Sequence, residues 1–444
     1  MDNKILADEL IRTCLKKGAD AAEIYLESGR QLSLEVRNGE VETVEEAATG
    51  GAGIRVFVQG KMAFAHSNDL SEVALENAAV RAIDFAKSMT SDPSNVLPDD
   101  KTSAEVEGLF DPEIAKIPLE TKLGLAKAVE KEALKDPRVT KSAGARYGEG
   151  EEEVVIANSN GLLKTARSAA CSYGVSVVAE KGEQKSSGGK SCSRRFFADL
   201  KKPGEIAAEA SQKAVSMLDS KTVKTQRAAV IFHPDVAGAL LGGIIGAIHG
   251  ERVLQGASFL AKRLDQKIAS DLVTIVDDGT MPKGLGSAPF DGEGVTTAKR
   301  VIIDKGVLKG FLYNTIVARR AGVQSTGNAS RGGFRSLPGI GPHNFYLAAG
   351  ASKPEDIVKA TKVGLLLKEV TGYGINPVNG QFSGGAAGFW VENGKISFPV
   401  KGLTIAGTAE EILFGIDFVG SDLELERGTA APTFRVKVLQ IGGE

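Results

Sequence analysis

FWVENGKISFPVKGLTIAG, residues 389–407, consists of two apolar-rich segments joined by a Glu-Asn-Gly turn. Asparagine and glycine at such a point are typical of a chain reversal between strands, because both accept turn conformations that other residues avoid. KRVIIDKGVLKGFLYN at 299–314 repeats the arrangement around Asp-Lys-Gly, and FRVKVLQIGG at 434–443 adds a further strand. These segments predict a mostly antiparallel, barrel-like or curled sheet with a few helices, and they do not indicate parallel β-α-β winding.

Glycine content locates the start of this β-rich region. The chain has 53 glycines in 444 residues, and most of them lie after residue 228. Glycine marks sharp turns and close approaches of the backbone, so the two halves are expected to differ in architecture. The sequence therefore predicts an α+β protein with an N-terminal α+β unit at 1–110, a second α+β unit at 111–225 and a C-terminal β-rich domain at 226–444.

The two N-terminal units are predicted to share one order of helix, strands and helix. A single shift of the sequence superposes the turn Asn38-Gly39 on Asn160-Gly161. Two explanations stay open: an old duplication, or chance matching among common turn and strand residues. The predicted helices span about 3–17, 70–89, 118–135 and 203–218, and the predicted strands lie within 22–65 and 139–197.

Charge and composition exclude several classes of protein. Lys and Arg total 54 against 56 Asp and Glu, a formal net charge of −2. The chain therefore has no overall positive charge that would favour a nucleic-acid partner. The first 20 residues mix charges with apolar residues and resemble neither a signal peptide nor a membrane anchor. The apolar run at 237–248 is shorter than the roughly 20 residues that span a bilayer. Three cysteines suit reduced thiols, so we expect a cytoplasmic protein without a membrane partner.

Histidines are few, and their spacing matches no helical zinc motif. His249 and Glu251, one residue apart, and the distant His343 are the weak candidates for metal ligands. A structural or solvent-facing role for His249 is the favoured interpretation, since short motifs often mislead.

A stripe of glycines is the most informative feature of the helix predicted from Pro234 to about His249. Gly238, Gly242, Gly246 and Gly250 recur every fourth residue and so share one face. Each interior glycine costs a helix about 0.5–1 kcal/mol relative to alanine, so the stripe predicts close packing against a neighbour. A core element is favoured over a bound substrate as that neighbour.

Three longer stretches carry a resemblance to a known family. They are FDGEGVTTAKRVIIDKGVLKGFLYNTIVARRAG at 290–322, STGNASR at 325–331 and VNGQFSGGAAGFWVENGKISFPVKGLTIAG at 378–407. Together with the glycine-lined helix they resemble the TldD/PmbA family over the whole chain, and specifically its PmbA branch, also called TldE. The family's TldD branch is a zinc metallopeptidase, and the PmbA branch is its partner subunit.

The resemblance implies that the zinc motif of the family is empty in this chain. The TldD branch carries H-E-x-x-x-H, and the matching positions here are Gly242, Gly243 and Ala247. Glycine and alanine can neither ligate a metal nor accept a proton. The TldD branch also uses a cysteine near its C-terminus, whereas the last cysteine here is Cys192. No cofactor is therefore expected in this chain, and zinc is expected in a TldD-type partner.

These features predict a non-catalytic subunit that pairs with a TldD-type peptidase, or forms a homodimer without it, and takes part in proteolysis of unfolded peptides or in processing of a peptide precursor. One alternative is an active metallopeptidase homodimer with ligands recruited elsewhere, and another is a regulatory binding module of the type named modulator of DNA gyrase. The predicted catalytic set is empty, and the candidates for contact with a peptide or the partner are Gly238, Gly246, Gly250, Asp291, Glu293 and Ser383.

Overall fold

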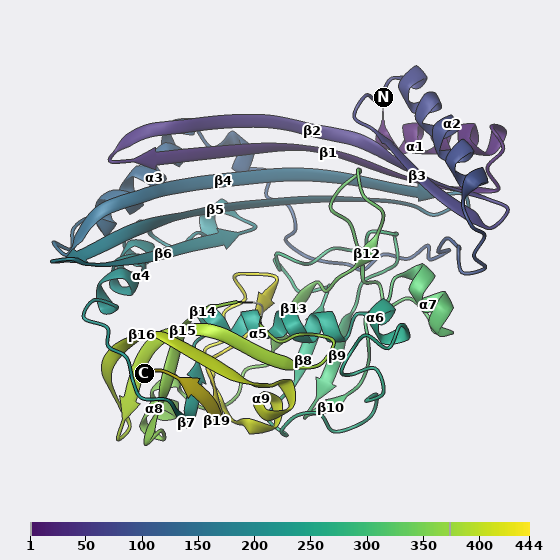
Figure 1. Cartoon of the computed structure of the whole chain (residues 1–444). Coiled ribbons are helices and arrows are strands. Elements are labelled where there is room, and N and C mark those ends of the chain that lie inside the picture. The colour runs from purple at the N-terminus through teal and green to yellow at the C-terminus, as the bar shows by residue number, and fades with distance from the viewer. Residues whose placement is uncertain (1, 373) are drawn as a thin grey trace.

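A long curved sheet arches over the C-terminal region of the molecule (Figure 1). The computed structural model describes residues 2–372 and 374–444. The first αβββα unit of the sheet comprises α1 (Asn3–Lys16), β1 (Ala21–Arg37), β2 (Glu40–Val58), β3 (Lys61–Ser67) and α2 (Glu72–Ser88). The second comprises α3 (Leu119–Ala133), β4 (Val139–Asn158), β5 (Leu163–Lys181), β6 (Gln184–Arg194) and α4 (Pro203–Ser216). The predicted order of helix, strands and helix thus occurs twice.

The two units form one sheet, because β1 and β4 pair antiparallel along almost their whole length. Its strand order is β3-β2-β1-β4-β5-β6, so β3 and β6 are its edges. Alternate residues of β1 point to opposite faces. Ile24 and Leu26 pack in the cluster formed with α1 and α2, and Leu34 packs in the cluster formed with α3 and α4. Tyr25 points to the other face, where it packs against Phe290 of the C-terminal region.

The C-terminal region contains a closed barrel, which confirms the predicted barrel-like sheet. Strands β16, β15, β14, β7 and β19 pair in that order, and β16 also pairs with β19, which closes the ring. Their bounds are β7 (Gln226–Phe232), β14 (Val363–Thr371), β15 (Gln381–Glu392), β16 (Lys395–Thr408) and β19 (Phe434–Gly442), with β17 (Ile416–Val419) added at the outside of β19.

The remaining C-terminal elements form a second sheet and several short helices. The sheet has the order β10-β9-β8-β13-β18. The strand bounds are β8 (Ile275–Asp278), β9 (Lys299–Asp304), β10 (Val307–Leu308), β11 (Ala329–Ser330), β12 (Gly339–Ile340), β13 (Asn344–Leu347) and β18 (Thr429–Ala430). The helices are α5 (Pro234–Ala247), α6 (Gly250–Leu254), α7 (Thr315–Ala321), α8 (Pro354–Lys359) and α9 (Ala409–Gly415). Among the described residues, no helix is long and apolar enough to cross a bilayer.

Strand pairing in the C-terminal region is mostly antiparallel, as predicted, and two strand pairs are parallel. β7 pairs parallel with β14, and β13 pairs parallel with β18. In both cases the paired strands are far apart in the sequence, so no turn signal in the sequence predicts that they pair. The hairpin turns, by contrast, are local, and Asn38-Gly39 and Asn393-Gly394 adopt the two successive positive φ angles of a type I′ turn.

Gly394 and Gly402 offer a matched test of the β15–β16 hairpin. Both have positive φ, 73° and 70°, but a Cβ on Gly394 would lie 2.6 Å from the Lys359 carbonyl oxygen, whereas nothing lies within 4 Å of one on Gly402. We expect Gly402→Ala to cost about 1–2 kcal/mol from backbone strain alone. Gly394→Ala should cost clearly more, measured as a lower Tm of the C-terminal region by calorimetry. Equal effects of the two variants would contradict this packing.

Candidate functional site

Helix α5 leaves strand β7 and lies in the core of the C-terminal region. His233 caps its N-terminus by accepting a hydrogen bond at Nδ1 from the Asp235 N–H, at 3.3 Å, and Pro234 occupies the first turn. Asp235 also forms an ion pair of 2.9 Å with Lys213 of α4. Although burial opposes it, the nearby His233 ring and the Lys213 ammonium hold the pKa of Asp235 below its ordinary value. The start of α5 is therefore tied to the second αβββα unit.

The predicted glycine stripe is divided between two helices, because α5 ends at Ala247 and Gly250 begins α6. Three of its four positions are closely approached: a Cβ on Gly238 would lie 3.2 Å from the Thr429 carbonyl oxygen, one on Gly246 would lie 3.0 Å from Pro377, and one on Gly250 would lie 2.3 Å from the Tyr313 ring. Gly242 is exposed, and among residues 2–372 and 374–444 nothing lies within 4 Å of a Cβ placed there. The backbone and side chains of the protein itself thus fill most of the stripe, and Gly242 is the open position.

The three positions that match the family's zinc motif differ in the space that they leave. Gly242 is open, but a Cβ on Gly243 would lie 2.5 Å from both Cβ and the carbonyl oxygen of Ile375. Ala247 is fully buried in the core cluster. A carboxylate at 243 or an imidazole at 247 would therefore collide with packed groups. These residues do not fit a zinc ion, both because they lack donor atoms and because two of them lack room for a ligand side chain.

The predicted metal candidates are not brought together. His249 caps α6, its Nδ1 has no hydrogen-bond partner among the described residues, and burial lowers its pKa. Glu251 lies 3.9 Å from Arg320, and His343 Nε2 lies 2.7 Å from the Gly327 carbonyl oxygen. Across residues 2–372 and 374–444, no group of three or more His, Cys, Asp or Glu side chains is placed to hold a metal ion.

Asp291 and Glu293 are buried and bonded within the chain. Asp291 accepts hydrogen bonds from the backbone N–H groups of Glu293, Val295 and Ala329, each at 2.9 Å, as a turn aspartate does. Burial and the nearby Glu293 carboxylate raise the pKa of Asp291 to about 7. Ser383, in contrast, is exposed on β15. Its neighbour Phe382 forms a β-bridge with Ile375, the residue that packs against Gly243.

Glu293 belongs to a buried network of four charges that joins the sheet to the C-terminal region. It accepts from Arg55 Nη1 at 2.9 Å and from the Thr315 N–H at 2.7 Å. Glu23 pairs with both Arg55 and Arg331. Burial by itself would lower the pKa of Arg55, but the carboxylates of Glu23 and Glu293 raise it, so the guanidinium stays charged. All four charged side chains are nearly inaccessible to solvent.

The sequence contains a signal for this network that the analysis of motifs missed. AAEIYL at 21–26 and GIRVFV at 53–58 each place one charged residue inside an apolar strand. A charge in such a strand is rarely buried unless it is paired. Glu23 and Arg55 lie opposite each other on β1 and β2, but their other partners, Arg331 and Glu293, come from segments more than 200 residues away, and no local pattern identifies those two.

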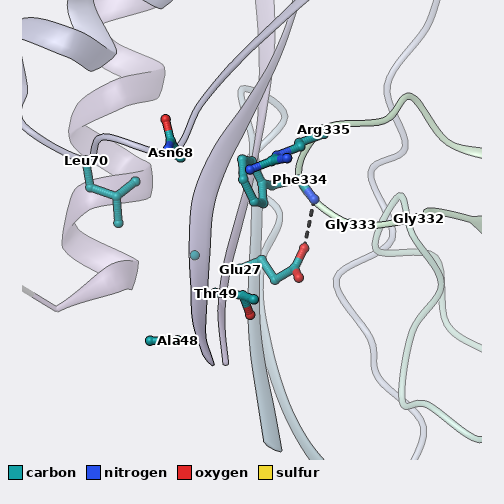
Figure 2. Close-up of a pocket in the computed structure, with 10 residues that line it drawn as sticks. Glu27, Ala48, Thr49, Asn68, Leu70, Gly332, Gly333, Phe334 and Arg335 are labelled. Atoms are coloured by element: carbon teal, nitrogen blue, oxygen red, sulfur yellow. Dashed lines mark hydrogen bonds between the residues drawn. The ribbon is translucent and has the colours of Figure 1, made fainter. Parts of the chain in front are cut away.

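A second contact between these regions lines the pocket in Figure 2. The segment after Arg331 brings Phe334 against β2, where a Cβ on Gly51 would lie 2.2 Å from the Phe334 ring. The Phe334 N–H donates to Glu27 Oε2 of β1 at 2.8 Å, the dashed line in Figure 2. The pocket beside this contact has a volume of about 590 Å³. Glycine at 51 is thus required by the docked ring.

A larger cavity, of about 1210 Å³, lies between the second αβββα unit and the C-terminal region. The edge strand β6 contributes 187–191 to its lining, α4 contributes Lys213, and the start of α5 contributes 233–235 and Gly238. The segment 422–431 and strands β14 and β15 complete it. The glycine stripe of α5 therefore begins in this cavity.

Glu293→Gln should destabilise the protein strongly, because it leaves Arg55 buried with one carboxylate fewer. We expect a loss of about 3–5 kcal/mol, the range found when one partner of a buried ion pair is removed. Glu46→Gln is the control, since the exposed pair between Arg30 and Glu46 should contribute less than about 1 kcal/mol. Thermal unfolding of both variants measures the difference, and a mild effect of Glu293→Gln would refute the role of the network.

Gly242→His and Ala247→His compare an open with a filled position of α5. Histidine at 242 should leave the Tm unchanged or slightly raised, because it replaces a helical glycine and meets no neighbour. Histidine at 247 should destabilise by about 1–3 kcal/mol or more through overpacking. Equal Tm values of the two variants in calorimetry would contradict the close packing described around Ala247.

Comparisons with known proteins cover almost the entire chain. Family models described as PmbA/TldA metallopeptidase domain 1, central domain and C-terminal domain match residues 22–89, 112–218 and 225–443. The chain is 33% identical to Metalloprotease PmbA of Escherichia coli O157:H7, over 99% of this chain and 97% of that protein.

Two solved structures are similar over nearly all of both chains. A putative modulator of DNA gyrase from Bacteroides thetaiotaomicron superposes with a TM-score of 0.92 at 28% identity, covering 100% of each chain. TldE from Thermococcus kodakarensis superposes with a TM-score of 0.89 at 26% identity, covering 99% of this chain and 100% of that one. The chain belongs to the PmbA/TldD metallopeptidase family.

Proposed function

We propose that this chain is a non-catalytic, PmbA/TldE-type subunit that pairs with a TldD-type zinc metallopeptidase in the cytoplasm and helps it to degrade unfolded peptides or to process a peptide precursor. In this proposal the zinc ion and the proton acceptor belong to the partner. The chain itself contributes binding surface, either in the hetero-oligomer or, without the partner, as a homodimer.

The geometry of α5 is the observation that carries the proposal. Zinc hydrolysis needs a held cation that lowers the pKa of bound water and a base that accepts its proton. Gly242, Gly243 and Ala247 supply neither a metal ligand nor a base. The packing of Ile375 leaves no room for a ligand side chain at 243, and the burial of Ala247 leaves none at 247. An active enzyme working alone would need ligands elsewhere, and the described residues place no such group together.

The large cavity supports a role in peptide binding. Its lining includes the edge strand β6, whose outer backbone groups have no neighbouring strand in the sheet. An extended peptide can pair with such an edge through backbone hydrogen bonds, which makes binding insensitive to side-chain sequence. The exposed Gly242 continues the α5 stripe one turn beyond Gly238, so a peptide leaving the cavity would meet a smooth helix surface.

Peptide cleavage by separate and combined subunits tests the proposal. The purified chain alone should not cleave casein or an unfolded peptide, a TldD-type protein co-expressed with it should, and a chelator should abolish that cleavage. Tightly bound, near-stoichiometric zinc in the isolated chain, with chelator-sensitive cleavage, would instead identify an active homodimer. Pull-down of gyrase without any peptidase would favour the regulatory alternative.

Gly242→Leu tests whether the open face of α5 contacts the peptide. A leucine there should weaken capture of an unfolded peptide several-fold without lowering the Tm, because no group of the described residues lies within 4 Å of a Cβ at 242. Gly246 is a poorer choice, since it already packs against Pro377. Gly124→Leu on the exposed face of α3 is the matched control, because it too meets nothing within 4 Å. Unchanged capture by Gly242→Leu would exclude this face.

A further inference from the structure

The large cavity is lined by many charged side chains, and most of them are paired. Lys190 of β6 lies 2.9 Å from Glu209 of α4, and Lys213 lies 2.9 Å from Asp235. Glu426 accepts ion pairs from Arg194 at 2.7 Å and from Lys201 at 2.9 Å. The pairs of Lys213 with Asp235 and of Arg194 and Lys201 with Glu426 cross the boundary between the second αβββα unit and the C-terminal region, whereas Lys190 and Glu209 both belong to that unit.

Lys368 is the exception among the lysines of the lining. It has no carboxylate within 4.0 Å among residues 2–372 and 374–444, and its ammonium forms no hydrogen bond with them. Burial lowers its pKa, with the charges of Asp235 and Lys213 also acting on it. The ammonium is thus partly withdrawn from water while the nearest carboxylates are already engaged with other lysines.

A β-bulge in β14 includes Lys368, which lies on the same face of the strand as Leu366. The register between β14 and β15 shifts between Leu367 and Glu369, so Lys368 has no directly paired residue. In a regular strand Lys368 and Glu369 would point to opposite faces, but here both line the cavity. Bulges commonly occur where a strand re-aims a side chain toward a binding site.

Apolar side chains line the same cavity as this ammonium. Among them are Leu366 and Phe389, from β14 and β15, and Met217 and Ile396. Asp235 and Glu209, the carboxylates whose charges act on Lys368, are already paired with other lysines, whereas the exposed Glu369 has no ion pair among the described residues. A cation in a cavity with apolar lining suits a ligand that has one carboxylate on an apolar body. Arg427, which also lacks an ion pair among the described residues, adds a second cation to the lining.

We propose that the cavity between β6 and the barrel holds a carboxylate of the bound peptide, and that Lys368 is its counter-ion. This inference rests on the proposed peptide-binding function and specifies one end of the site. The carboxylate can come from the C-terminus of the peptide or from an acidic side chain, because Lys368 would donate a charge-assisted hydrogen bond to either. Strand pairing with β6 would supply the remaining, sequence-independent contacts.

Three labelled peptides of one apolar-rich sequence test the site by fluorescence anisotropy with the full-length chain. The first has a free C-terminal carboxylate, the second is amidated but carries an internal glutamate, and the third is amidated without any acid. We expect at least one acidic form to bind about tenfold more tightly than the third, the size of one charge-assisted hydrogen bond. Which acidic form gains affinity identifies the source of the carboxylate.

Variants of Lys368 decide whether it is the counter-ion. Lys368→Met should remove the advantage of the acidic peptide and leave the affinity of the third peptide unchanged, and Lys368→Arg should retain most of it. Lys362→Met, an exposed lysine just before β14, is the matched control and should change nothing. An advantage that persists in Lys368→Met, or equal binding of all three peptides, would overturn the carboxylate site alone. If no peptide bound the wild-type chain, the proposed peptide-binding function would fail as well.

Discussion

The buried charges of Glu23, Arg55, Glu293 and Arg331 are the constraint on which the arrangement of the molecule depends. Each of them would be costly to bury alone, since an unpaired ion loses its hydration without compensation. They are compatible with burial only when the sheet and the C-terminal region meet in one orientation, which places Arg55 between Glu23 and Glu293 and Arg331 beside Glu23. The network therefore selects a geometry, and the contact of Phe334 with Gly51 and the large cavity depend on that geometry.

Helix α5 is held by packing and carries no metal-ligating side chain at positions 242, 243 and 247. Its apolar residues pack in the core cluster of the C-terminal region. Ile375 occupies the space that a side chain at 243 would need. A single substitution to histidine or glutamate would therefore not supply a set of metal ligands. On this ground the proposed function assigns the chemistry to a partner subunit.

The boundary between the second αβββα unit and the C-terminal region is held by ion pairs and also contains the large cavity. Lys190, Arg194 and Lys201 pair with Glu426 across it, which fixes the two sides of the cavity. The edge of β6 and the ammonium of Lys368 remain available inside. The proposed site would recognise backbone and one charge rather than a side-chain sequence, which suits the proposed role in binding unfolded peptides.

The sequence by itself determined the local elements: the helices, the hairpins closed by Asn-Gly and Lys-Gly turns, and the lack of metal-ligating side chains at 242, 243 and 247, because these depend on periodicity, on positive φ and on the identity of single residues. Only the tertiary structure decided which strands far apart in the sequence pair, as in β1 with β4 and β7 with β14. It also decided that Asp291 and Glu293, predicted as candidates for ligand contact, are buried, and that Lys368, absent from the predicted set, lines a cavity without an ion pair to any described residue. Long-range pairing and burial arise from the packing of complete elements, and no local pattern encodes which distant groups will meet.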